Sequence, residues 1–499
     1  MTANAFERLK ERLAEVADLK NAATLLAWDE RVMMPPAGAA ARADALATVG
    51  RLAQERFVST DVERLLDELR GLEETSAYDS FEASLIRVTR RDFQKASRVP
   101  PELVGELRRA AILGLSAWGP AKAESNFEAL RPSLEKNLEL LQRYIECFDK
   151  PEERYDVLLD NYEPGMKTAE VRETFAGLKE ELPSLIRAIG EGDDVDASFL
   201  SGEFDIDRQR ELSLEIVRRF GYTDEEWTLH PTPHAFMSTP GAGDIRLTTT
   251  FRPDDLSSLF GTMHEFGHGV YEWGVDRSLA RTPLGTGVSL GVHESQSRLW
   301  ENLVGRSRSF WRFFYPRLQQ TFVRQLGAID DETFYRAVNK VRPSFIRIDA
   351  DEVTYNMHVI LRFEVEQELI DGRLSLADLP AAWNAHMEEY LGVEVPDDTR
   401  GVLQDMHWAG GSFGYFPTYS LGNVISVQIW DRLQEDLGDL DERFEHGEFG
   451  ELRDWLREHL YRLGRKFTPQ ETIERVTGSP IDSGPYLRYL REKLAPQPA

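Results

Sequence analysis

Apolar residues recur at i, i+3 and i+4 spacing along most of this 499-residue chain, with charged residues between them. This periodicity predicts helices over residues 5–28, 40–70, 80–118, 125–148, 168–190 and 206–220, and again from 254 to about 395. A loop-rich segment at 396–424 separates these helices from others that reach the end of the chain. No internal repeat or linker marks a boundary, so we expect a mostly α-helical fold with a single domain over residues 1–499.

Strand signal is concentrated in one place. Residues 244–251 alternate in polarity and contain β-branched side chains, and they follow the turn Pro240-Gly241-Ala242-Gly243. Residues 234–237 precede that turn. The pattern predicts one short β-hairpin or small sheet directly before the helix that begins near Asp254.

The charge balance excludes one class of partner. Acidic residues outnumber basic ones, 86 to 59, which gives a formal net charge of −27. A surface this acidic repels phosphate backbones, so no nucleic acid is expected as a partner, and we interpret the charge as a solubility device. No apolar run approaches the ~18 residues of a membrane span. One cysteine, Cys147, and a start without a secretory signal pattern favour a cytoplasmic location.

The stretch His264-Glu265-Phe266-Gly267-His268 carries the chemistry that is easiest to interpret. Asp254 or Asp255 can cap the helix that contains it. On a helix, residues four apart project from one face, so both imidazoles can bind a single Zn²⁺. Glu265 lies beside the first histidine, where it can act as a general base on water without ligating the metal.

Two further features support a catalytic centre. Gly267 lies within the helix, where glycine costs about 1 kcal/mol relative to alanine, so another element is expected to pack closely there. Glu294 follows His268 by 26 residues and opens a second helical run. Two histidines and a glutamate leave the fourth zinc position for water. His293 is the alternative third ligand, because the phase of the second helix is not determined by the sequence.

Several further segments match one known family. They are residues 244–248 (Asp-x-Arg-x-Thr), 293–295 (His-Glu-Ser), 346–351 (Ile-Arg-x-x-Ala-Asp), 401–408 (Gly-x-x-Gln-Asp-x-His-Trp), Trp28-Asp29 and Met33-Met34-Pro35-Pro36. With the zinc motif, they make the whole chain resemble the Taq-type metallocarboxypeptidases (the thermostable carboxypeptidase 1 family). One departure is His234-Ala235-Phe236, where the family has His-Pro-Phe. The loss of proline frees a backbone torsion and restores an N–H donor.

The resemblance implies a zincin-type fold, with helical lobes around a deep active-site cleft and zinc at its floor. It implies a peptidase that removes single residues from peptide C-termini with broad specificity. The cofactor would be one Zn²⁺ per chain, for which Co²⁺ can substitute, and the assembly a homodimer.

A carboxypeptidase must also recognise the free carboxylate of its substrate, and a guanidinium suits this task through bidentate pairing. Arg347 is the candidate, with Asp349, Asp351 and Glu352 as residues that could orient it. The alternative is that Arg347 only pairs with these acids on a helix.

Four other residues are assigned to the substrate-binding region. His407 or Tyr419 could donate a hydrogen bond to the tetrahedral oxyanion, the alternative for both being a packed structural role. Arg246 is expected to brace the cleft while its strand pairs with the peptide backbone. His234 completes the set.

Two other functions compete with this prediction. An oligopeptidase or dipeptidase of the neurolysin type would share the zinc motif but not the segments at 346–351 and 401–408. A catalytically inactive helical scaffold that binds zinc only for stability would have no need of Glu265.

Overall fold

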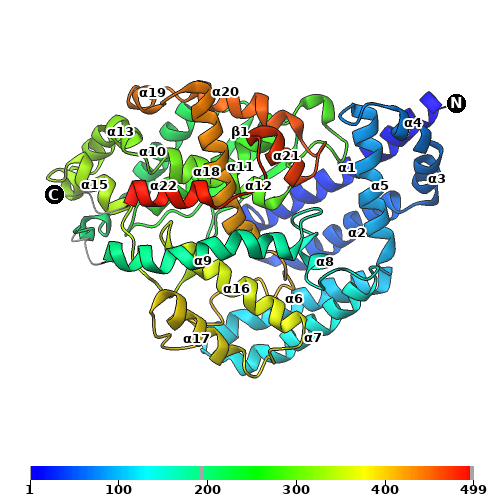
Figure 1. Cartoon of the computed structure of the whole chain (residues 1–499), viewed down its shortest axis with the longest axis horizontal. Helices are drawn as coiled ribbons and strands as arrows, with labels where there is room; N and C mark the ends of the chain where they lie inside the picture. Colours follow the sequence, from blue (N-terminus) through cyan, green and yellow to red (C-terminus); the bar gives the residue numbers. More distant parts are fainter. Residues whose placement is uncertain (1, 191–194, 495–499) are drawn as a thin grey trace.

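The computed structural model describes residues 2–190 and 195–494, and helices dominate it (Figure 1). The helices are α1 (Thr2–Val32), α2 (Ala39–Phe57), α3 (Thr60–Glu68), α4 (Arg70–Thr75), α5 (Phe81–Arg98), α6 (Pro101–Ala123), α7 (Phe127–Glu146), α8 (Asp156–Leu159), α9 (Thr168–Gly190), α10 (Ile206–Phe220), α11 (Ser257–Gly274), α12 (Leu290–Arg298), α13 (Arg308–Thr321), α14 (Val323–Leu326), α15 (Asp331–Val338), α16 (Thr354–Ile370), α17 (Leu379–Leu391), α18 (Pro417–Leu437), α19 (Asp441–Glu445), α20 (Gly450–His459), α21 (Pro469–Thr477) and α22 (Gly484–Leu494). The mostly α-helical fold predicted from the periodicity is therefore confirmed.

Two of the predicted helices are each divided in the structure. The range 40–70 contains the end of α2 and the start of α3, where the Ser59 side chain accepts a hydrogen bond from the Val62 N–H as an N-cap. The range 80–118 is interrupted between α5 and α6 at Val99 and Pro100, both in extended conformation. Proline disfavours helical torsions in the residue before it, so α6 begins only at Pro101.

A three-stranded sheet contains the predicted hairpin and one strand that the sequence pattern missed. Strands β2 (Met237–Gly241) and β3 (Asp244–Thr249) pair antiparallel, which confirms the hairpin, but β2 begins only at Met237 and includes Pro240 and Gly241 of the predicted turn. Strand β1 (Trp227–Pro231) pairs parallel with β3 and completes the order β1-β3-β2. Parallel pairing has no local turn that a sequence pattern could reveal, which is why β1 was not predicted.

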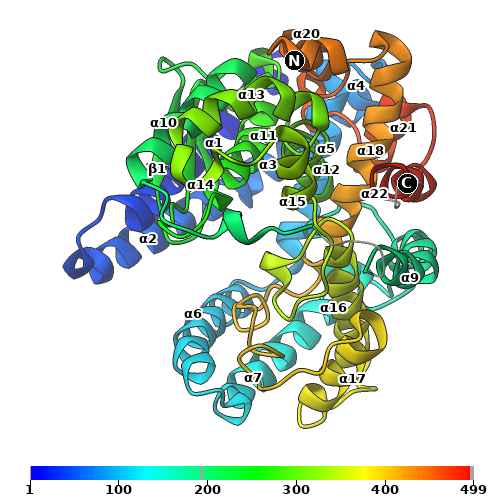
Figure 2. The ribbon, with the colours of Figure 1, turned by 90° about the vertical axis from the view of Figure 1, so that its left-hand side faces the viewer.

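The helices form two groups with α16 between them (Figure 2). Helices α6, α7 and α17 gather at the lower end of this view, while α10, α11, α13 and α18 lie in the upper part. None of the helices within residues 2–190 and 195–494 combines the length and apolar character that crossing a bilayer requires.

The sheet and helix α12 pack tightly against α11. A side-chain Cβ added at Gly269 would lie 2.5 Å from the Trp227 ring of β1 and 2.9 Å from Ile245 of β3. On another side, a Cβ at Gly267 would lie 2.4 Å from the Gln296 carbonyl oxygen and 2.5 Å from the Ser297 Cα. The close packing predicted from Gly267 is thus confirmed, and it brings the backbone of α12 directly against α11.

Because these neighbours are backbone atoms, Gly267→Ala is expected to lower the free energy of unfolding by about 3 kcal/mol, through overpacking that the site cannot relieve. Gly105→Ala is the matched control, since Gly105 also lies within a helix and a Cβ there meets nothing within 4 Å. This control is expected to gain about 0.5–1 kcal/mol from reduced chain entropy. Urea denaturation of both variants measures the difference, and equal effects would contradict the packing argument.

Candidate metal centre and active site

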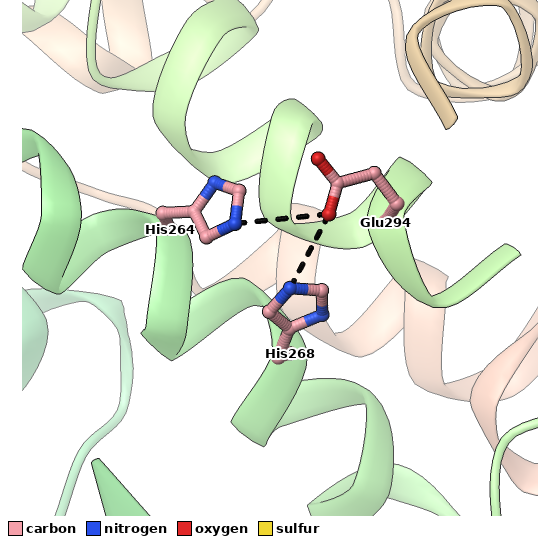
Figure 3. Close-up of side chains that lie close together, drawn as sticks. All are labelled: His264, His268 and Glu294. Atoms are coloured by element: carbon pink, nitrogen blue, oxygen red, sulfur yellow. Dashed lines mark ion pairs between the residues drawn. The ribbon is translucent and has the colours of Figure 1, made fainter. Parts of the chain in front are cut away.

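Helix α11 presents the imidazoles of His264 and His268 and the carboxylate of Glu265 from adjacent turns. Leu256 is the N-cap of the helix and no side chain caps it, so the predicted cap at Asp254 or Asp255 is wrong; Asp255 instead accepts the Ser257 N–H from the position before the N-cap. His264 and His268 lie one turn apart, with ring centroids separated by 5.0 Å. Glu294 reaches them from α12, and all three side chains converge on one point (Figure 3).

The distances among the three side chains suit a single small cation. One ligand atom from each of His264, His268 and Glu294 lies within 4.8 Å of the others. The Glu294 Oε2 atom is 3.7 Å from His264 Nε2 and 3.4 Å from His268 Nε2. Tetrahedral zinc ligands at about 2.0–2.1 Å from the metal lie about 3.3 Å from one another. The two distances to Glu294 are close to this value and the remaining one is at most 4.8 Å, so the described side chains suit a small metal ion.

Glu294 is held so that one oxygen faces the histidines. Its Oε1 accepts a hydrogen bond from Arg298 Nε at 2.7 Å, which leaves Oε2 directed toward the imidazoles. Although burial opposes ionisation, the adjacent Arg298 guanidinium holds the pKa of Glu294 well below its ordinary value. A Cβ at Gly422 of α18 would lie 2.5 Å from Glu294 Cγ, so close helix packing also restricts this side chain. The carboxylate is charged and oriented for a cation.

His264 is oriented by a second carboxylate that the sequence analysis did not identify. Its Nδ1 donates to Glu301 Oε2 at 2.9 Å, which leaves Nε2 for the metal. Glu301 lies in a π-helical turn (Leu299–Val304) that continues α12, and it also accepts from Arg306 at 3.1 Å. Such turns are frequent at functional sites. The spacing of Arg298 and Glu301 from Glu294, one and two helical turns, is the signal that could have revealed both.

His293, the alternative third ligand, lies beside the three converging groups. Its Nδ1 is 2.8 Å from His268 Nδ1, the nitrogen of His268 that faces away from Glu294. Its Nε2 donates to Glu272 at 3.0 Å. Both ring nitrogens of His293 therefore have partners in the protein.

Glu265 is 6% exposed and extends from the same helix turn as His264. Burial, together with the nearby charges of Glu294 and Glu301, raises the pKa of Glu265 to about 7. A carboxylate whose pKa is near neutrality can both accept and release a proton at physiological pH. This property suits the predicted general base.

Arg347 is buried, and its partners differ from those predicted. It donates from Nη2 to Asp405 at 2.8 Å and from Nη1 to Tyr355 at 2.7 Å. The predicted pairing with Asp349, Asp351 or Glu352 is wrong. Arg347 lies in a 3-10 turn rather than on a regular helix.

The three acids near Arg347 in sequence face elsewhere. Asp351 accepts the Val353 and Thr354 N–H groups, both at 3.0 Å, at the start of α16. Glu352 pairs with Lys493 at 2.8 Å. Asp349 is exposed at the surface. Two of the three carboxylates are therefore engaged elsewhere, Asp351 by backbone N–H groups at the start of α16 and Glu352 by Lys493 of α22.

Asp405 is shared by two buried guanidinium groups. Besides Arg347, it accepts a hydrogen bond from Arg362 Nε at 2.7 Å, and the Arg362 side chain is fully buried. The two arginines outweigh burial and hold the pKa of Asp405 well below its ordinary value. Two positive charges thus meet one negative charge in this cluster.

The arginine cluster is contiguous with the converging groups of Figure 3. The Tyr355 ring lies 4.6 Å from the guanidinium carbon of Arg298, the residue that holds Glu294. The same tyrosine hydroxyl accepts from Arg347. Tyr355 therefore connects the predicted carboxylate-binding residue with a predicted metal ligand.

His407 and Tyr419, the two candidate oxyanion donors, lie together. His407 Nε2 and the Tyr419 hydroxyl are 3.3 Å apart, and the Arg347 guanidinium lies 4.8 Å from the centre of the Tyr419 ring. Burial lowers the pKa of His407 to about 4 and raises that of Tyr419. Both are therefore neutral groups at physiological pH. Tyr415, which the sequence analysis did not select, packs against both rings.

The remaining two predicted residues lie around the sheet. Arg246 makes a bidentate pair with Asp244 and lies 4.5 Å from the Trp28 ring of α1, so it ties β3 to the N-terminal helix. His234 is exposed in the loop before β2, and its carbonyl accepts from the Thr232 hydroxyl at 2.8 Å. In the same loop, Phe236 exchanges hydrogen bonds with Thr248 despite the alanine at 235.

A helix with two histidines and a glutamate between them, a carboxylate from a second helix, and a small sheet against the first helix together define a metallopeptidase of the zincin class. The family model for carboxypeptidase Taq (M32) metallopeptidases matches residues 8–494, and the chain belongs to this family. It is therefore a metallocarboxypeptidase, and the oligopeptidase alternative is not supported.

Individual relatives agree with this assignment. The chain is 41% identical to thermostable carboxypeptidase 1 of Thermus thermophilus, with 98% of each protein covered. It is 35% identical to carboxypeptidase 1 of Bacillus subtilis, over 97% of this chain and 96% of that protein. The crystal structure of an M32 carboxypeptidase from Deinococcus radiodurans R1 superposes with a TM-score of 0.95 at 39% identity, covering 98% of this chain and 99% of the other.

Proposed function

We propose that this metallocarboxypeptidase uses one Zn²⁺, held by His264, His268 and Glu294, to remove single residues from peptide C-termini with broad specificity. The observation that supports cutting from the C-terminus is the buried cluster in which Arg347 and Arg362 both pair with Asp405. A buried excess of positive charge is costly unless an anion compensates for it. The α-carboxylate of a peptide is such an anion.

The chain's own residues account for most of the proposed chemistry. When bound, zinc supplies a Lewis acid for the attacking water and the scissile carbonyl. Glu265 accepts the proton of that water and delivers it to the leaving amine. His407 and Tyr419, both neutral and adjacent to Arg347, provide donors for the developing oxyanion. Arg347 binds the terminal carboxylate through the nitrogen atoms that Asp405 and Tyr355 orient.

Arg246 of β3 and His234 have supporting roles in this proposal. Arg246 braces the substrate side of the sheet through its contact with Trp28. We assign to His234, which is exposed in the loop before β2, contacts with the peptide chain away from the scissile bond.

A pair of matched peptides tests whether the enzyme requires a free C-terminus and cuts from that end. The same sequence is offered with a free C-terminus and with an amidated one, and products are followed by mass spectrometry. The free peptide is expected to shorten by one residue at a time, while the amidated peptide is cut at least about 100-fold more slowly, because a charge-assisted bidentate contact is lost. Equal rates for the two peptides would overturn the carboxypeptidase assignment of Arg347.

We also propose a cytoplasmic homodimer. Cys147 is a free thiol, which fits a reducing compartment. Helix α6 exposes two adjacent large apolar side chains, Ile112 at 66% and Leu113 at 55%, which a second copy could cover.

A further inference from the structure

The two predicted imidazole ligands are oriented by different means. His264 donates from Nδ1 directly to the carboxylate of Glu301. His268 has no carboxylate at its Nδ1 within hydrogen-bonding distance among the described residues, and its partner there is the Nδ1 of another imidazole, His293, at 2.8 Å. Two ring nitrogens can share one hydrogen bond only if one is protonated and the other offers a lone pair.

The far side of His293 determines the direction of that hydrogen bond. Its Nε2 lies 3.0 Å from Glu272 Oε1, and this oxygen also accepts from the Thr286 hydroxyl at 2.8 Å and the Gly287 N–H at 2.9 Å. An ionised carboxylate can only accept, so His293 Nε2 carries a hydrogen. In a neutral imidazole, Nδ1 of His293 is then an acceptor. It follows that His268 donates from Nδ1 and that its Nε2 keeps a free lone pair toward Glu294.

The His293 ring is also held mechanically. Its centroid is 5.1 Å from that of Tyr271 and 4.9 Å from that of His268. A Cβ at Gly287 would lie 2.9 Å from His293 Cδ2, so the loop backbone closes over the ring edge. The side chain has little freedom to rotate away from His268.

We propose that His293 is a positioning residue for the metal centre: it accepts the Nδ1–H of His268, and with Glu272 behind it fixes the tautomer that presents Nε2 to the cation. Residues 293 and 294 of α12 then have different tasks, since Glu294 faces the cation and His293 orients a ligand on α11. The inference rests on the proposed assignment of His264, His268 and Glu294 as ligands. Its support in the structure is the chain of hydrogen bonds from His268 to Glu272.

Two variants of nearly equal shape test this role. In His293→Asn, the side-chain oxygen occupies the place of Nδ1 and can still accept from His268; in His293→Leu, a methyl group stands there. Removal of a residue that orients a metal ligand weakens metal affinity by about 10- to 100-fold. We therefore expect the leucine variant to bind Zn²⁺ about 10- to 100-fold more weakly than wild type, and the asparagine variant to remain within about threefold of it.

Zinc affinity is measured by competition with a chromogenic chelator, without reference to peptidase activity. The visible absorption of the Co²⁺-loaded Asn variant is expected to match that of wild type, because the ligand set is unchanged. Thermal unfolding of the metal-free forms checks folding, and His446→Leu, at an exposed histidine whose Nδ1 contacts the Glu442 carbonyl at 2.6 Å, is the control for loss of a histidine.

Several results would overturn the inference. If His293→Leu binds zinc with the affinity of wild type, His293 does not position His268. If both variants bind zinc equally weakly, the effect comes from the packing of the ring instead. A changed cobalt spectrum in the Asn variant makes His293 a direct ligand. If wild type itself binds no zinc, the proposed metal centre fails and this inference fails with it, whereas wild-type affinity in His293→Leu or equal weakening in both variants leaves the proposed ligand set intact.

Discussion

Glu265→Gln is expected to reduce kcat about 1,000-fold, because general acid–base catalysis contributes about 10²- to 10⁴-fold and glutamine can neither accept nor deliver the proton. KM should change little, since Glu265 is not among the residues assigned to substrate binding. Steady-state kinetics on a C-terminally free peptide measure the effect. Folding should be preserved, because a buried carboxylate with its pKa raised to about 7 gains nothing from its charge in the folded state.

Metal content and thermal unfolding distinguish a catalytic role of Glu265 from a structural one. The variant should bind one zinc per chain with the affinity of wild type, since His264, His268 and Glu294 converge without Glu265. A loss of zinc would mean that the carboxylate supports the ligands rather than the reaction. Unchanged turnover with zinc present would remove Glu265 as the base.

Arg347→Gln is expected to reduce kcat/KM for peptides with a free C-terminus by about 30- to 5,000-fold, the range that corresponds to the 2–5 kcal/mol lost when one partner of a buried charge pair is removed. The slow cutting of amidated peptides should not change, because those substrates have no carboxylate to bind. Arg347→Lys should restore little, since an ammonium group cannot reproduce the planar, bidentate geometry held by Asp405 and Tyr355.

Arg400→Gln is the control for a lost guanidinium in the same region. Arg400 pairs with Asp397 at 2.6 Å, and its side chain is 50% exposed. Its replacement should leave kcat/KM within about twofold of wild type, because surface ion pairs contribute little. If Arg347→Gln slows free and amidated peptides equally, Arg347 supports the fold of the cluster and does not bind the carboxylate.

Local spacing explains what could be predicted about the metal centre. His264 and His268 share a helix face because the α-helix repeats every ~3.6 residues, and this requires no knowledge of the rest of the chain. Gly267 indicated close packing for an equally local reason, and the structure confirms it. The hairpin followed from its alternating pattern and its glycine-containing turn.

The errors and omissions at the site depend mainly on contacts between distant segments, whereas the two divided helices had local causes at Ser59 and Pro101. Arg347 was assigned to acids that follow it within five residues, yet its partner Asp405 comes from a loop 58 residues away. Glu272 was not identified, because its contact with His293 exists only once α11 and α12 are packed together. Glu301, which accepts from His264, was also missed, although its helical spacing from Glu294 was visible in the sequence.

The sequence by itself determined the chemistry of the centre: two imidazoles four residues apart, a glutamate between them, and a mostly helical chain to carry them. Tertiary structure alone decided how each group is oriented, including the free Nε2 atoms of both histidines, the inward oxygen of Glu294 and the buried excess of positive charge at Arg347. The physical reason is that helix periodicity acts over a few residues, whereas the closeness of α12 to α11 at Gly267, and of α18 to α12 at Gly422, comes from packing across the whole chain.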